Sequence, residues 1–304
     1  MPQPSADLEI HATDWPEPAF DLCHGHEALP IALSEGCPCD CSYCASRRLA
    51  PAYRRLSPER VFAQARAWHE RWGTRDFAFY DDALLLGVGR SAEDNAGRRL
   101  ARGARRSGED AAAPTTPSDG APSGERGAGR FFDLAADSGL GLRFHAPNGL
   151  HYGPITTALA RLLRRGGLET VRLSLESASP ERLAAWGRAG DNAAFRRAVG
   201  ALREAGYTRR QVGAYILVGL PGQTLDEVHR AIELARDAGA MPKINEYSPI
   251  PGTREWPRAL ALSGPEIETE PLWQNNSLYR TRPEAFPLAE FRDLHSLALA
   301  AGEK

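Results

Sequence analysis

Four of the five cysteines lie in one short segment, residues 34–47, which reads SEGCPCDCSYCASR. Three of them, Cys37, Cys41 and Cys44, follow the spacing CxxxCxxC. Cysteine thiolates are the usual ligands of iron–sulfur clusters, and most clusters are held by four of them. Three thiolates in one loop would therefore bind three irons of a four-iron cluster and leave the fourth iron open to a reactant.

A zinc site is the main alternative for this loop, because zinc also binds thiolates. A closed zinc site needs a fourth Cys or His, and the downstream His145 and His151 do not have a zinc-ribbon spacing. Cys39 could replace one of the cluster ligands, but it falls outside the CxxxCxxC spacing. We expect a cluster in which Cys39 takes no part, with a zinc site or free thiols as the alternatives.

The composition is that of a globular protein. With 304 residues and 42% hydrophobic content, the chain can form one large domain. The net charge of −2 argues against a nucleic-acid partner, without excluding one, and gives no attraction to an anionic membrane. The N-terminus has no signal-peptide pattern, and no apolar run approaches about 18 residues. We therefore expect a cytoplasmic protein with no membrane partner.

The order of predicted elements indicates an α/β fold. Amphipathic helical patterns alternate with short apolar strands, which begin near residues 31, 77, 143, 171, 213 and 243. Six such repeats predict a parallel sheet with right-handed crossovers. The pattern alone is also compatible with a flat, doubly wound sheet.

We divide the chain into three parts. Residues 1–30 form a polar lead-in, 31–260 the core, and 261–304 a loop followed by a last amphipathic helix. Within the core, residues 87–129 are rich in Gly, Ala, Arg and Ser and cannot bury apolar surface. This segment is therefore predicted to be a disordered insertion.

Polar and small residues gather where the predicted strands end. Ligands of parallel βα folds bind at the carboxyl ends of the strands, so these positions are candidates for a site. Glu176 is the most informative of them, because a charged residue within an apolar strand needs a partner. The other positions have structural alternatives. Helix capping is the alternative for Asp81 and Asp82, a tight turn for Asn148, and a solvated helix end for Arg188.

The cysteine loop, including Tyr43 before its last cysteine, resembles the signature of the radical S-adenosylmethionine (SAM) superfamily. The motifs VRLSLES, ILVGLPGQT and YSPIPGT also resemble those of this family, over roughly residues 29–260. The resemblance implies a [4Fe-4S] cluster on Cys37, Cys41 and Cys44, with SAM on its open iron. It also implies a partial (βα)6 TIM-barrel-like core with a short C-terminal helical extension.

The resemblance further implies contacts to SAM at the strand ends. Asp81 and Asp82 would bind the amino group, Glu176 the ribose hydroxyls and Arg188 the carboxylate, while Gly219 would let the backbone approach the adenine. The expected cofactor-binding residues are completed by Tyr43, Asn148 and Ser174.

The implied function is reductive cleavage of SAM, which starts radical chemistry on an unidentified substrate. An external one-electron donor of the flavodoxin or ferredoxin type would reduce the cluster. The catalytic halves of cobalamin-binding radical SAM proteins and methylthiotransferases are the most similar groups, but we expect neither a cobalamin domain nor a second cluster. A non-enzymatic iron–sulfur or zinc-binding protein is the alternative function. Candidate substrate contacts are His145, His151, Tyr215, Glu246 and the pair Asn275–Asn276.

Overall fold

The computed structural model describes residues 18–86, 127–188, 190–276 and 288–303. They form one six-stranded sheet in which every neighbouring pair is parallel. Its order is β1 (Ala28–Ile31), β4 (Asp76–Phe79), β5 (Arg143–Leu150), β6 (Leu168–Glu176), β7 (Val212–Val218) and β8 (Met241–Glu246). The six predicted strands and the parallel sheet are thereby confirmed.

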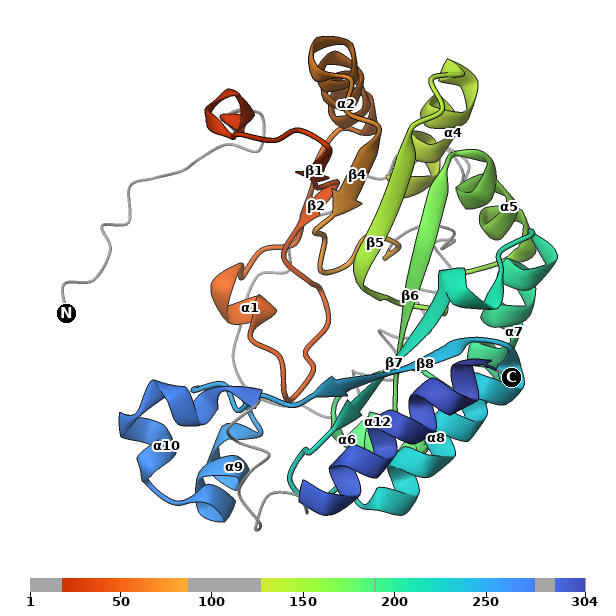
Figure 1. Cartoon of the computed structure of the whole chain (residues 1–304). Helices are drawn as coiled ribbons and strands as arrows, with labels where there is room; N and C mark the ends of the chain where they lie inside the picture. The colour runs from red at the N-terminus through yellow and green to blue at the C-terminus, as the bar shows by residue number, and fades with distance from the viewer. Residues whose placement is uncertain (1–17, 87–126, 189, 277–287, 304) are drawn as a thin grey trace, which may run out of the picture.

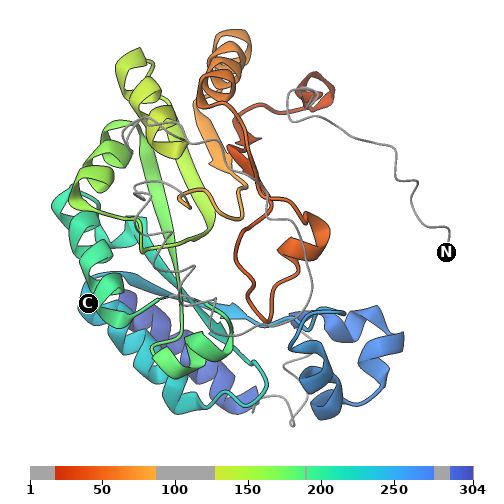
Figure 2. The same cartoon turned by 180° about the vertical axis from the view of Figure 1, so that it is seen from behind.

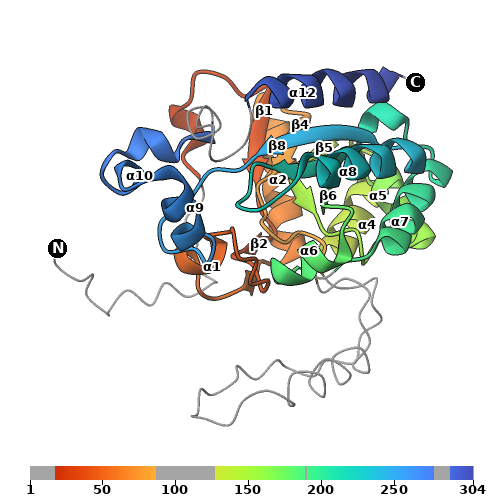
Figure 3. The ribbon, with the colours of Figure 1, turned by 90° about the horizontal axis from the view of Figure 1, so that it is seen from below.

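The strand order distinguishes between the two α/β alternatives. A doubly wound sheet reverses its strand order at a switch point, whereas this sheet runs in sequence order from one edge to the other. In that sheet β1 and β8 are both edge strands, so the barrel is partial. Figures 1 and 2 show the helices on the outer side of the curved sheet, and Figure 3 shows the same arc from below.

Local sequence signals begin and end the helices between the strands. The Ser57 hydroxyl accepts from the backbone amide of Arg60 at the start of α2 (Pro58–Trp72), and Gly73 ends that helix with φ 72°. The predicted Thr224–Glu227 capping box is present at α8 (Leu225–Ala238). The other helices that cover the sheet are α4 (Ala128–Ser138), α5 (Thr157–Arg165), α6 (Pro180–Ala185) and α7 (Asn192–Glu204).

The structure describes only the last residues of the predicted insertion, 87–129. Residues 87–126 lie outside the described part of the chain, and the helix α4 already begins at Ala128. Its Phe131 and Phe132 are fully buried and pack against a ring cluster on β4 and β5. The first two residues of α4 thus coincide with the last two residues of the predicted insertion.

Strand β6 shows how the sheet separates a core from a site. Side chains alternate between the two faces of a strand, and Val171, Leu173 and Leu175 are all buried in the hydrophobic core. The alternate positions carry Ser174 and Glu176, which are buried but polar. One face of β6 thus packs in the core, while the other presents polar groups toward the carboxyl end of the strand.

The chain after β8 belongs partly to the same core. It continues through α9 (Trp256–Ser263), α10 (Glu266–Thr269) and the 3₁₀ segment Pro271–Gln274. The last helix, α12 (Leu288–Glu303), runs beside α8 (Figure 1) and buries Leu294 and Ala298 in the main hydrophobic core. None of the helices in the described ranges is long and apolar enough to cross a membrane.

Candidate functional site

The cysteine loop connects β2 (Ser34–Glu35) to the short helix α1 (Ser46–Leu49). A two-stranded pairing of β2 with β3 (Arg54–Arg55) closes it on the other side. Gly36 enters the loop with φ 72°, and a Cβ there would lie 2.7 Å from the carbonyl oxygen of Ala52. Only glycine fits both this conformation and this approach, so the loop is tightly folded at its start.

Ser42 anchors the middle of the loop to the opposite side of the barrel. Its backbone amide donates to the carbonyl of Trp186 (2.8 Å), and its hydroxyl donates to Oε1 of Glu255 (2.8 Å). The amide of Glu255 donates back to the carbonyl of Ser42 (3.1 Å). The segments that follow β6 and β8 therefore hold the loop across the carboxyl ends of the strands.

Asp81 anchors the chain where it enters the loop. Its carboxylate accepts bonds from the amide of Leu33 (3.0 and 3.1 Å) and from the hydroxyl of Ser34 (2.6 Å). Burial raises the pKa of this carboxyl to about 6, although the hydrogen bonds oppose the increase. These bonds occupy the carboxylate of Asp81, whereas its neighbour Asp82 is exposed. The predicted contact of Asp81 and Asp82 with SAM stays a prediction.

Replacing Asp81 by Ala should destabilise the entry to the cysteine loop. The amide of Leu33 and the hydroxyl of Ser34 would lose their acceptor, and unsatisfied buried donors cost about 1–3 kcal/mol each. We expect the free energy of unfolding to fall by about 2–4 kcal/mol in a urea titration. The exposed Asp82→Ala variant is the control, with an expected change within about 0.5 kcal/mol. Equal stability of the two variants would contradict the anchoring role of Asp81.

The loop cysteines differ in burial and in the groups that they contact. None of the loop cysteines forms a disulfide; Cys37, Cys39 and Cys41 are half-buried, whereas Cys44 is exposed. Burial raises the pKa of Cys41, while the guanidinium of Arg188 lowers it from 3.9 Å away. A hydrogen bond with Cys39 and burial raise the pKa of Cys37.

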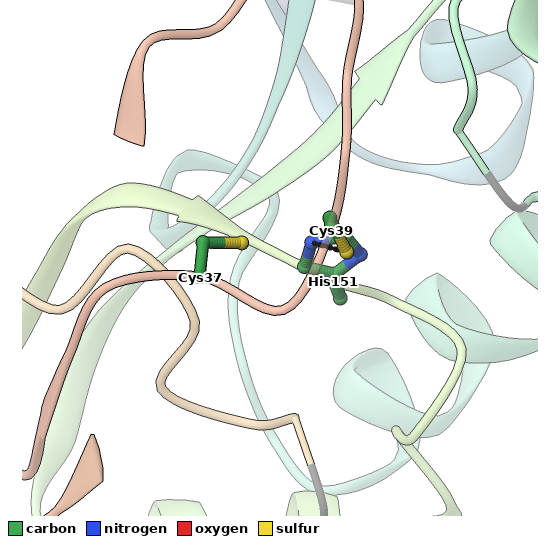
Figure 4. A group of neighbouring side chains, drawn as sticks. All are labelled: Cys37, Cys39 and His151. Carbon is green, nitrogen blue, oxygen red and sulfur yellow. Dashed lines mark hydrogen bonds between the residues drawn. The ribbon is translucent and has the colours of Figure 1, made fainter. Parts of the chain in front are cut away.

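Cys39 also lies close to a histidine. Its sulfur is 3.7 Å from Nε2 of His151, which follows β5. Figure 4 shows the two side chains facing one another, with the Cys37 sulfur directed toward them. The ligand atoms of Cys37, Cys39 and His151 all lie within 4.8 Å of one another.

Glu176 and Arg188 form the buried polar centre of the site. Nη2 of Arg188 lies 4.0 Å from Oε1 of Glu176, and the two side chains are only 7% and 8% exposed. Nη2 of Arg188 also donates to the carbonyl of Ser174 (3.1 Å), and Nη1 lies 3.5 Å from the hydroxyl of Tyr43. Burial raises the pKa of Glu176, an effect that Arg188 opposes.

Two features mark Glu176 as unusual. It has φ 64°, the one positive value among the described non-glycine residues, and such a backbone conformation costs about 1–3 kcal/mol. Its Oε2 is buried without a hydrogen-bond partner in the described structure. A buried acceptor of this kind is costly unless a ligand supplies a donor.

Asn148 and Gly149, which lie within β5 rather than in a tight turn, and Gly219, which follows β7, complete the site. A Cβ at Gly149 would lie 1.9 Å from the Ser174 hydroxyl, so a larger residue would displace the Ser174 side chain. The preceding Asn148 donates to the carbonyl of Asp81 (3.3 Å). Gly219 has φ 92°, and its amide donates to Oε1 of Gln223 (2.9 Å).

The structure separates most of the candidate substrate contacts from this centre. His145 binds Asp76 and Thr170 at the start of β5, and Glu246 pairs with His295 of α12. Asn275 and Asn276 lie beyond the last 3₁₀ segment. His151 contacts the cysteine loop through Cys39, and Tyr215 donates to the carbonyl of Pro147.

The residues present fit the expected cofactors. Cys37, Cys41 and Cys44 offer three free thiols on a loop held against the strand ends, which matches a cluster with one open iron. The unsatisfied Oε2 of Glu176 offers an acceptor for a hydroxyl group. Arg188 lies between these two parts, within 4.0 Å of both Cys41 and Glu176.

Comparisons with known proteins agree with this site. A family model described as the radical SAM superfamily matches residues 31–235. The chain is 24% identical over 269 residues to an uncharacterized methyltransferase, PH0819, from Pyrococcus horikoshii, and this match covers 85% of the chain and 49% of the relative. The chain thus spans about half the length of the curated relative it matches.

Solved structures show the same fold. A radical SAM methyltransferase, TsrM from Kitasatospora setae, with cobalamin and a [4Fe-4S] cluster bound, gives a TM-score of 0.54 at 16% identity, covering 77% of this chain and 39% of that one. TsrM with tryptophan and the SAM analog aza-SAM bound gives 0.54 at 18% identity, covering 78% and 39%. At these identities the likeness concerns the fold.

Proposed function

Because the chain belongs to the radical SAM superfamily, we propose that Cys37, Cys41 and Cys44 hold its [4Fe-4S] cluster and that Glu176 and Arg188 line the SAM site. A [4Fe-4S] cluster and SAM are the cofactors of this enzyme family. Bound together, they supply one-electron cleavage of the sulfonium, which starts radical chemistry on a substrate. The observation that carries the proposal is the position of Arg188 between Cys41 and Glu176.

The buried pair gives each end of SAM a distinct partner. Arg188 presents a cation beside the cysteine loop, where it can bind the SAM carboxylate. Glu176 presents a carboxylate that can accept from the ribose hydroxyls, one of its oxygens being without a partner. Because both side chains are almost inaccessible to water, these interactions are stronger than at the surface. We propose that Tyr43, Ser174 and Gly219 shape the same pocket.

Anaerobic reconstitution with iron and sulfide tests the proposal. We expect the absorption of a [4Fe-4S] cluster and, after reduction, cleavage of SAM to methionine and 5′-deoxyadenosine. The assay should also measure S-adenosylhomocysteine, since a relative is described as a methyltransferase. A protein with a full cluster that neither binds nor cleaves SAM would contradict the proposal.

The enzyme needs an external reductant, and we propose an acidic donor of the flavodoxin or ferredoxin type. Cys44, the exposed cysteine of the proposed triad, is followed at once by α1. Four exposed arginines, Arg47, Arg48, Arg54 and Arg55, surround this stretch, here called the basic rim. No acidic residue occurs in the sequence between Cys41 and Glu59. A reducing compartment, and hence the cytoplasm, suits both the free thiols and such a donor.

Reversing the charge of the basic rim should slow reduction by a protein donor. With Arg47, Arg48, Arg54 and Arg55 changed to Glu, we expect the rate constant for reduction by flavodoxin to fall at least about 10-fold at low salt. The rate for the unchanged protein should itself fall steeply as ionic strength rises. Stopped-flow absorbance of the cluster measures both effects.

Two controls separate docking from damage to the site. Reduction by dithionite should be unchanged in the basic-rim variant, because a small reductant needs no docking surface. Changing the exposed Arg196 and Arg197 of α7 to Glu should leave reduction by flavodoxin unchanged. Equal rates for the two variants would show that the donor binds elsewhere.

A further inference from the structure

We propose that Cys37, Cys39 and His151 form a mononuclear site for a thiophilic divalent ion of the Zn²⁺ class. We further propose that this ion and the iron–sulfur cluster compete for Cys37. The competition rests on the proposed function, because it assumes that Cys37 is a cluster ligand. The mononuclear site itself rests on the geometry of the three side chains.

The distances match a single ion. Zinc binds sulfur at about 2.3 Å and imidazole nitrogen at about 2.0–2.1 Å in tetrahedral geometry, so neighbouring ligand atoms lie about 3.5–3.8 Å apart. The Cys39 sulfur and His151 Nε2 are 3.7 Å apart, and all three ligand atoms lie within 4.8 Å of one another. Small rotations of the Cys37 side chain would therefore complete the triangle.

The fold brings the three residues together from two segments. Cys37 and Cys39 are separated by Pro38 within the loop, and His151 follows the last residue of β5. Figure 4 shows all three side chains converging on one point between the loop and the end of β5. All three are half-buried, so solvent or a further ligand can occupy a fourth position.

The donor set selects the class of metal. Two thiolates and one imidazole are ligands that zinc prefers, whereas magnesium and calcium prefer oxygen. The ion replaces the protons of both thiols, so its charge balances the two thiolates. Three protein ligands with an open fourth position give a more labile site than a closed structural one.

Cys37 cannot serve both metals at the same time. In a cubane cluster each thiolate binds a different iron, so the sulfurs of Cys37, Cys41 and Cys44 must be farther apart than ligands of one ion. In the mononuclear state Cys37 is paired with Cys39 and His151 instead. The loop therefore has two exclusive metal states, and a bound Zn²⁺ would block cluster assembly until it is removed.

Titration of the metal-free protein with Co²⁺, a spectroscopic substitute for Zn²⁺, tests the site. Under anaerobic conditions we expect thiolate-to-cobalt charge transfer and the visible bands of tetrahedral Co²⁺, both lost when one equivalent of Zn²⁺ is added. Cys39→Ser and His151→Ala should each weaken Co²⁺ binding at least about 10-fold. Cys41→Ser and Cys44→Ser are the matched controls and should bind Co²⁺ like the unchanged protein.

The opposite pattern would overturn the site. Loss of the Co²⁺ bands in Cys41→Ser or Cys44→Ser, with full binding in Cys39→Ser, would show that the ion uses the cluster ligands. Circular dichroism of each variant verifies folding, and the two separate ligand variants keep the test valid if one of them fails to fold.

Reconstitution in the presence of Zn²⁺ tests the competition. One equivalent of Zn²⁺ should lower iron incorporation in the unchanged protein but not in Cys39→Ser, which lacks the mononuclear site. Equal inhibition of both proteins would refute the competition. Reconstitution without zinc tests the cluster assignment alone, so a failure of the proposed function and a failure of this inference give different results.

Discussion

Serine at Cys37, Cys41 or Cys44 is expected to abolish the [4Fe-4S] cluster. Each of the three thiolates would hold one iron, and a hydroxyl is a poor replacement for a soft thiolate ligand. Iron content and the cluster absorption should fall to background after anaerobic reconstitution, and SAM cleavage should be lost with them. The loss should be near complete for each single variant, because the loop has no spare thiol at the right spacing.

Cys39 and Cys23 provide the matched controls for this prediction. Neither cysteine forms a disulfide, and neither belongs to the CxxxCxxC spacing. Serine at either position should leave iron and sulfide content within experimental error of the unchanged protein. A cluster that is lost in Cys39→Ser and kept in Cys37→Ser would show that Cys39 is a ligand.

Periodicity predicted the scaffold well because each signal was local. The strand alternation of β6 and the capping box of α8 depend on residues within a few positions of one another. The beginning of α4 was harder to place, since it follows a segment of low complexity without a cap hydrogen bond. Its buried Phe131 and Phe132 were the available signal.

The anchors of the site could not be read from the sequence in the same way. Ser42 and Glu255 are 213 positions apart, and neither belongs to a sequence pattern that predicts their hydrogen bond. The resemblance to a known family implies that Asp81 contacts SAM, but no sequence pattern predicted that its carboxylate also binds the backbone that enters the cysteine loop. Such assignments depend on side-chain direction, which strand order alone does not specify.

The proximity of His151 to Cys39 is a further example. From the sequence, His151 follows a predicted strand and Cys39 lies in the cysteine loop. Only the order of the strands in the sheet shows that the end of β5 and the loop meet. Spacing rules recognise ligands that are near in sequence. They do not detect a pair that is 112 residues apart.

Glu176→Gln is expected to weaken SAM binding about 10–100-fold while leaving the cluster intact. Charge-assisted hydrogen bonds to the ribose hydroxyls are worth about 1.5–3 kcal/mol, and the amide would lose the charge and turn one acceptor into a donor. Equilibrium binding of SAM and iron content should be measured on the same sample. The exposed Glu181→Gln variant, in the next helix, is the control and should bind SAM normally.

The same substitution should change how stability depends on pH. Burial raises the pKa of Glu176 above its ordinary value of 4.5, so the folded state binds this proton more tightly than the unfolded state. Its contribution to stability is complete below pH 4.5 and is lost as pH rises through the raised pKa. In Glu176→Gln this loss of stability with rising pH should be absent. Urea titrations from pH 4.5 upward, in the absence of SAM, measure the free energy of unfolding of both proteins.

Glu176→Gly separates the effect of this residue on stability from its effect on SAM binding. Removing the carboxylate leaves the buried Arg188 without its partner, so the comparison that isolates the strain is with Glu176→Ala, which loses the same pair. Glycine adopts φ 64° without strain and alanine does not, so the free energy of unfolding without SAM should be about 1 kcal/mol higher for Glu176→Gly than for Glu176→Ala. SAM affinity should nevertheless fall at least as far as in Glu176→Gln. Functional sites commonly retain strain of this kind at the expense of stability. Equal stability of the glycine and alanine variants would show that the backbone at residue 176 is not strained.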